Sequence, residues 1–151
     1  MEITLTIQRL MTALDTTFKD LIDMSDVAHD ADDEKRKQFL SRALAAFCIT
    51  SLTECPAKEA AASITDGFND QGIDAIHFDP AEKTVYLIQS KWSSNGNKTI
   101  NLGDFEKFLK GVQYLILPDF SGFNDRIRKR RGDQEESFTA IGRESCACTR
   151  P

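Results

Sequence analysis

The sequence predicts a single α/β domain in which a short sheet, built around an antiparallel hairpin, is flanked by helices. The chain has 151 residues and 40% hydrophobic content, enough to bury one core. Apolar residues repeat at helical spacing before residue 64 and after residue 103, whereas β-branched and aromatic residues dominate between them. We expect a domain over residues 1–125, with helices in 1–64, a hairpin in 65–92 and a packing helix in 103–117.

Three helices are expected in the N-terminal region. The first twenty or so residues carry apolar side chains every three or four positions, which is typical of an amphipathic helix. Asp32 or Asp33 can cap a second helix, whose apolar face extends to Leu52. Pro56 suits the first turn of a short third helix that continues to Ile64.

Two strands follow, Ile73–Asp79 and Thr84–Lys91, and the four residues between them form the turn of a hairpin. A pairing of Asp79 with Thr84 fixes the register of the whole hairpin. Asp74 then lies directly opposite Gln89, with Lys91 on the diagonal. After a polar turn, Asp104 opens the packing helix and Pro118 ends it.

The converging carboxylate, amide and ammonium groups suit phosphodiester hydrolysis. A divalent cation held by oxygen ligands polarises the phosphate and acidifies a bound water. Asp74 is the candidate ligand, Gln89 offers a weaker carbonyl oxygen, and Lys91 can stabilise developing charge or help deprotonate the water. Asp66 and Asp70, one loop upstream, are weaker metal candidates. The alternative interpretation is an exposed ion pair at the rim of a hairpin.

Two segments carry a resemblance to a known family: ITDGFNDQGIDA, residues 64–75, and YLIQSK, residues 86–91. They resemble the PD-(D/E)xK nuclease superfamily, and more narrowly the Mrr-like restriction endonucleases and the N-terminal region of abortive infection phage resistance (AIPR) proteins. The motifs of those proteins read D-G-x-x-D-x-G-I-D and Q-S-K. The similarity in layout covers roughly residues 36–117, and the detailed match covers residues 64–92.

The resemblance implies a restriction-endonuclease-like core with a short mixed sheet and a nuclease that cuts DNA with Mg²⁺ or Mn²⁺, in antiphage defence or restriction. Asp74 would be the metal-binding aspartate, and Gln89 with Lys91 the second motif in its Q-x-K variant. Glu54 or Glu59, on a helix before the sheet, could join the metal site.

The chain departs from the family in length and strand number. Family members are usually several times longer, and their core has four or more strands, whereas Phe138–Ile141 is the one weak further strand expected here. An incomplete sheet leaves an exposed edge, so a homodimer or a missing C-terminal region is expected to complete it. The alternative function is a truncated, non-catalytic DNA-binding or assembly module.

Charge is distributed unevenly along the chain. The net charge of −5 excludes a uniformly basic nucleic-acid coat protein. Residues 126–151 are expected to form a basic and then polar disordered tail. Its basic residues are weak candidates for phosphate contacts, although a solvated tail is the commoner reading of such a run. They are Arg126, Arg128, Lys129, Arg130 and Arg131.

Cysteine usage and the N-terminus both indicate a cytoplasmic protein. Cys48, Cys55, Cys146 and Cys148 follow no disulfide framework, so free thiols are expected in preference to a zinc site. The N-terminus interleaves charged and apolar residues, unlike a signal peptide. No window approaches the roughly 18 apolar residues of a membrane span, so no membrane partner is expected.

Overall fold

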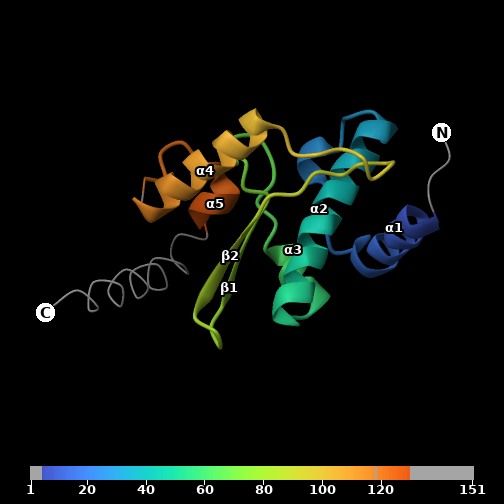
Figure 1. Ribbon diagram of the computed structural model, residues 1–151, viewed down its shortest axis with the longest axis horizontal. Helices are drawn as coiled ribbons and strands as arrows, with labels where there is room; N and C mark the ends of the chain where they lie inside the picture. The colour runs from blue at the N-terminus through green and yellow to red at the C-terminus, as the bar shows by residue number, and fades with distance from the viewer. Residues whose placement is uncertain (1–4, 118, 130–151) are drawn as a thin grey trace, which may run out of the picture.

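The computed structural model describes residues 5–117 and 119–129, which form a small α/β structure (Figure 1). The elements follow one another as α1 (Leu5–Phe18), the 3₁₀ turn η1 (Ser25–Val27), α2 (Asp32–Thr53), α3 (Ala57–Ala62), β1 (Ala75–Asp79), β2 (Thr84–Ile88), α4 (Leu102–Ile116) and α5 (Asp125–Lys129). The expected α/β class, a small sheet flanked by helices, is therefore confirmed at this level. None of the helices in the described ranges has the length and apolar character that a membrane crossing demands.

The sheet of the described residues is the antiparallel pair β1–β2. Its register runs from Ala75 opposite Ile88 to Asp79 opposite Thr84, which confirms the pairing expected from the four-residue turn. The chain just before the hairpin lies along the other edge of β1: Ile64 and Ala75 form a β-bridge. The Thr65 amide also donates to the Asp74 carbonyl over 2.9 Å. The start of β1 is thereby paired on that edge as well.

Two hydrophobic clusters lie on opposite faces of the hairpin because side chains alternate along β1. Ala75 belongs to the cluster formed with α1, α2 and α3, while its neighbour Ile76 belongs to a second cluster that includes Leu115 of α4 and Ile127 of α5. Figure 1 shows the same arrangement, with α1–α3 on one side of the hairpin and α4–α5 on the other. The loop before β1 and the end of β2 therefore lie where both helical layers meet.

The expected helices and strands occur with shifted ends. α1 ends at Phe18, before the last apolar residues of its periodic pattern, and α4 begins earlier than expected because Asn101 caps it. The Asn101 side-chain oxygen accepts a hydrogen bond from the Asp104 amide over 2.8 Å. β2 ends at Ile88, so Gln89 and Lys91 follow the paired part of the strand.

Residues 126–129, the start of the expected tail, are helical in the structure. They belong to the short helix α5, because Ile127 is fully buried in the second cluster and Arg126 bonds to the carboxylates of Asp23 and Asp26. Cys48 and Cys55 are free thiols, as expected. Several residues named above lie outside the described ranges. They are Pro118, Arg130, Arg131, Phe138–Ile141, Cys146 and Cys148, and the rest of the expected tail beyond Lys129 lies outside these ranges as well.

Candidate active site

A pocket of about 230 Å³, called the acidic pocket below, opens where α2, the loop before β1, the end of β2 and α4 meet. Its polar lining includes all five residues that the sequence placed nearest the chemistry, together with two from α4. These are Asp66, Asp70, Asp74, Gln89, Lys91, Asp104 and Lys107. The residues that the hairpin register and the preceding loop were expected to bring together therefore line one pocket.

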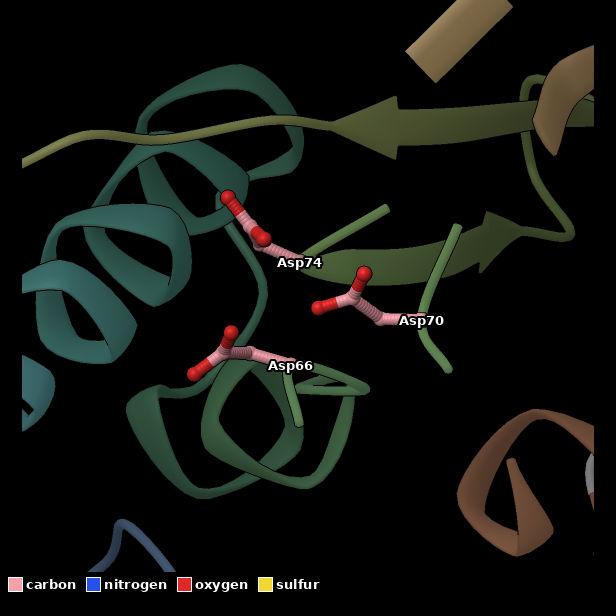
Figure 2. A group of neighbouring side chains, drawn as sticks. All are labelled: Asp66, Asp70 and Asp74. Carbon is pink, nitrogen blue, oxygen red and sulfur yellow. The ribbon is translucent and has the colours of Figure 1, made fainter. Parts of the chain in front are cut away.

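Three carboxylates form the centre of the pocket. Asp66, Asp70 and Asp74, the acidic trio, each offer an oxygen atom, and these atoms all lie within 4.8 Å of one another. Figure 2 shows the three side chains reaching toward a common space from separate parts of one loop. Among the described residues, this is the one group of three or more acidic, histidine or cysteine side chains close enough to share a metal ion.

The loop reaches this shape because its backbone turns tightly under α4. Gly72 has φ +78°, and a Cβ there would lie 3.0 Å from the backbone nitrogen of Phe108. Gly111 of α4 is equally constrained, because a Cβ would lie 2.6 Å from the Gln71 carbonyl oxygen. The two glycines thus allow α4 to approach the loop closely, and this approach brings Asp104 and Lys107 to the pocket.

Asp74 is the least compensated of the trio. Its Oδ2 accepts a 2.5 Å hydrogen bond from the Ser90 amide, so the end of β2 fixes its orientation. Burial raises the pKa of Asp74 to about 7. The Ser90 hydrogen bond and Lys107 lower this pKa, whereas the neighbouring charges of Asp66 and Asp70 raise it. A cation placed beside Asp74 would relieve this unfavourable negative potential.

Asp66 is held by an ion-pair network beneath α2. Arg42 is fully buried and donates from Nε to Asp66 over 2.7 Å. Both terminal nitrogens of Arg42 bind the Asp26 carboxylate, over 2.8 and 2.7 Å, and one of them also binds the Asp23 carbonyl. Arg126 of α5 binds the Asp66 carbonyl over 2.7 Å. We call these five residues the Arg42 network.

Asp70 organises the loop while it faces the pocket. Its carboxylate accepts hydrogen bonds from the Gly72 amide over 2.7 Å and the Gly67 amide over 3.3 Å. Lys107 of α4 forms an ion pair with it, with Nζ 2.9 Å from Oδ1. Asp70 is therefore both a turn residue and the contact that brings a lysine into the acidic pocket. No motif or spacing in the sequence pointed to Lys107, which lies in the second turn of α4.

The side chains of Gln89 and Lys91, which follow β2, both contact Asp104 in the first turn of α4. The Gln89 side-chain nitrogen donates to the Asp104 carbonyl over 3.0 Å. Lys91 forms an ion pair with the Asp104 carboxylate, which lowers the pKa of Asp104. Asp104 was expected to open the packing helix, and the structure gives it this second contact in the pocket.

The remaining candidates lie elsewhere. Glu59 lines a separate hollow of about 650 Å³, together with Arg126 and Lys129, and Glu54 is the left-handed residue that ends α2. Neither glutamate lines the acidic pocket. Arg126 is bound to Asp23, and Arg128 lies 3.7 Å from Asp125, so these two cations contact acidic residues of the chain itself.

The donors of the acidic pocket fit a hard divalent cation. Carboxylate and carbonyl oxygens are the ligands that Mg²⁺ and Mn²⁺ prefer. In the described hydrogen bonds, Arg42 engages Oδ2 of Asp66 and Ser90 engages Oδ2 of Asp74, which leaves the Oδ1 atoms of both residues without a bond. Asp74 is therefore the main candidate ligand, with Asp66 and Asp70 beside it.

Comparisons of the chain with protein-family models, with curated proteins and with solved structures gave no match. The similarity to PD-(D/E)xK nucleases thus rests on the motif residues of the sequence, and the nuclease relationship stays a prediction.

Proposed function

We propose that this chain is a metal-dependent nuclease domain that hydrolyses phosphodiester bonds in DNA. One observation carries the proposal: three carboxylate oxygens lie within 4.8 Å of one another in a pocket that two lysines also line. Acidic ligands for a cation beside ammonium groups for a phosphate suit metal-assisted phosphodiester hydrolysis. The motif resemblance adds DNA as the substrate and antiphage defence or restriction as the setting.

Asp74 would hold Mg²⁺ or Mn²⁺, with Asp66 and Asp70 completing the oxygen ligands. When bound, the cation supplies Lewis-acid polarisation of the phosphate and lowers the pKa of a coordinated water. The Ser90 amide keeps Asp74 aimed at the pocket, and Arg42 keeps Asp66 from turning away. The chain therefore contributes a ligand set whose orientation is fixed before a cation binds.

The two lysines would bind the phosphate. Lys91 reaches the acidic pocket from the segment after β2, and Lys107 reaches it from α4. Each lysine side chain is more than 45% exposed, so a phosphate oxygen can approach both. Their carboxylate partners, Asp104 and Asp70, restrain where the ammonium groups lie. In the transition state, where negative charge on the phosphoryl oxygens grows, fixed ammonium groups provide stabilisation without rearranging.

A non-catalytic module that binds DNA or assembles with another protein is the second candidate. One observation favours it: Asp66 and Asp70 are already compensated by Arg42 and Lys107. A phosphate-binding surface can persist in such a pocket after metal chemistry is lost. This candidate predicts DNA binding without metal-dependent cleavage.

Cleavage of supercoiled and linear DNA in Mg²⁺ or Mn²⁺ tests the proposal. We expect nicking that EDTA abolishes and that falls by about 10²-fold or more in Asp74→Asn and in Lys91→Met. The first variant weakens the metal site, and the second removes an ammonium group that would bind the phosphate. Asp20→Asn and Lys58→Met make the same chemical changes at exposed positions outside the pocket and should leave the rate unchanged.

Metal titration separates the two candidates when no cleavage is seen. Mn²⁺ should raise the unfolding midpoint of the wild-type chain and of Asp20→Asn but not of Asp74→Asn, because a ligand of the folded state stabilises that state. Absence of both cleavage and metal stabilisation in a folded chain would reject the nuclease proposal. Salt-sensitive DNA binding in that chain would support the non-catalytic module.

A further inference from the structure

α4 carries more apolar surface than the domain buries. Phe108, Gly111 and Leu115 face the loop and the second cluster. Beside this buried face runs a second apolar line, called the α4 stripe, of which four members are 44–71% exposed and one is half-buried. Its members are Leu102, Phe105, Leu109, Val112 and Ile116. A helix that is apolar on more than its core face is normally covered by another element.

The spacing within the α4 stripe is that of helix pairing. Its residues follow one another at intervals of three, four, three and four, the repeat that places side chains along one seam between two helices. In Figure 1, α4 lies at the periphery of the molecule, with the hairpin and α5 on its inner side. The stripe is therefore accessible to a second helix.

The stripe is close to symmetric about Leu109. Leu102 and Ile116 lie seven residues to either side of Leu109. Phe105 lies four residues before Leu109, and Val112 lies three residues after it. A second, antiparallel copy of α4 would therefore place Leu102 opposite Ile116 and bring Phe105 close to Val112.

Glu106 and Lys110 lie together on one flank of the stripe, four residues apart and centred at almost the same point. In an antiparallel pair, a two-fold axis perpendicular to both helices relates the two copies of α4. The flank that carries Glu106 and Lys110 then lies on the same side of the contact in both copies, so each Glu106 would face the partner's Lys110.

We infer that the α4 stripe pairs with the stripe of a second copy of this chain, in an antiparallel helix–helix contact centred on Leu109. Apolar side chains form the seam, and two symmetry-related Glu106–Lys110 ion pairs set its direction. A parallel pairing would instead place this charged flank against the buried face of the partner helix, where Phe108 and Leu115 lie.

The inferred pairing has a consequence for the acidic pocket. Asp104 and Lys107 belong to α4 and line that pocket. A dimer through α4 would therefore hold the pockets of the two copies at fixed positions about the two-fold axis. Glu106 and Lys110 do not line the pocket. The dimer and the nuclease proposal can therefore succeed or fail independently.

Sedimentation of the full chain over a range of concentrations tests the inference. The wild-type chain should show a monomer–dimer equilibrium that Leu109→Glu abolishes, because two carboxylates would then meet on the axis. Leu52→Glu is the matched control: Leu52 of α2 is 55% exposed and lies outside the stripe, so this variant should dimerise like the wild type. Circular dichroism of both variants is the control for correct folding.

A charge swap tests the direction of pairing. Glu106→Lys places lysines opposite lysines and should weaken the dimer by roughly 2- to 30-fold, and Lys110→Glu should act similarly. The double variant restores both ion pairs with their signs exchanged and should recover the wild-type dissociation constant. A chain that stays monomeric at about 1 mM, a Leu109→Glu dimer of wild-type strength, or a double variant no tighter than the single ones would overturn the inference.

Discussion

The Arg42 network and the acidic trio share Asp66, yet their effects on the pKa of a neighbouring carboxyl group are opposite. In the network, hydrogen bonds from Arg42 lower the pKa of Asp26 to about 2, although burial opposes this. In the trio, burial and two neighbouring carboxylates raise the pKa of Asp74 to about 7. A carboxylate supplied with a fixed cation stabilises the fold, whereas one left without a cation is suited to binding one.

The difference originates in which elements supply the cations. Arg42 projects from the middle of α2, is enclosed on all sides, and gains the Asp23 carbonyl as a further acceptor. Lys91 and Lys107 come from the far side of the pocket and remain partly exposed. They contact Asp104 and Asp70, respectively, and neither forms an ion pair with Asp74. The comparison predicts large stability effects in the network and functional effects in the trio.

Arg42→Met should produce the largest loss of stability. It leaves Asp26 and Asp66 without their buried partner, and breaking such a pair from one side typically costs about 3–5 kcal/mol of unfolding free energy. Urea denaturation followed by circular dichroism measures it. Arg36→Met is the matched control, because Arg36 of the same helix pairs with Asp15 on a surface where both side chains are more than a third exposed. That variant should lose at most about 1 kcal/mol.

Equal losses in the two arginine variants would contradict the contrast between a buried network and an exposed pair. Protein abundance alone would not decide it, because a marginal domain can lose solubility for other reasons. If Arg42→Met does not fold at all, Arg42→Lys supplies the second measurement. It keeps the charge but loses the bidentate contact to Asp26, so it should fall between the wild type and the methionine variant.

Asp74→Asn should stabilise the metal-free chain at high pH. Burial raises the Asp74 pKa from 3.8 to about 7, so the folded state holds its proton more tightly than the unfolded state does. The stability from this group is present below about pH 4 and is lost as the pH rises through about 7. The asparagine variant avoids this loss. Its unfolding free energy relative to the wild type should therefore rise between pH 4 and pH 8, by about 1–4 kcal/mol.

Chemical denaturation at four or five pH values in EDTA measures this gain. Asp20→Asn provides the baseline, because it makes the same chemical change at an exposed position outside the pocket. If the difference in unfolding free energy between Asp74→Asn and the wild type does not change with pH, burial does not raise the pKa of Asp74.

The hairpin and the site differ in how far the sequence could predict them. The register followed from a four-residue turn and side-chain alternation, and it correctly brought Asp74, Gln89 and Lys91 to one pocket. Arg42 was missed, although it interrupts the apolar face of α2 between Phe39 and Ala46, a position where a charged residue needs buried partners.

Other features depend on contacts between distant segments, which periodicity cannot reveal. Lys107 reaches Asp70 only because Gly72 and Gly111 let α4 approach the loop, and each glycine looks ordinary in the sequence. α5 has a single buried apolar residue, Ile127, too few for a periodic pattern. Local rules therefore predicted elements and register, while the compensation of charges depended on tertiary packing.

The affinity for a metal ion should rise as Asp74 loses its proton, and this change is the smallest of the predicted effects. A cation must displace the proton, so its apparent affinity should rise with pH until the carboxylate is ionised in the free chain. With the pKa of Asp74 near 7, the association constant for Mn²⁺ should increase about tenfold between pH 6 and pH 8. Calorimetric titration measures it, together with the proton released into buffers of different ionisation enthalpy.

The proton count distinguishes Asp74 from its neighbours. At pH 6 binding should release close to one proton, and at pH 8 close to none, because Asp74 is then already ionised. Release that stays near zero at both pH values would mean that the cation does not displace a proton from Asp74. The affinity would then depend on Asp66 and Asp70, whose charges Arg42 and Lys107 already compensate, and the contrast between the Arg42 network and the acidic trio would no longer identify the metal ligand.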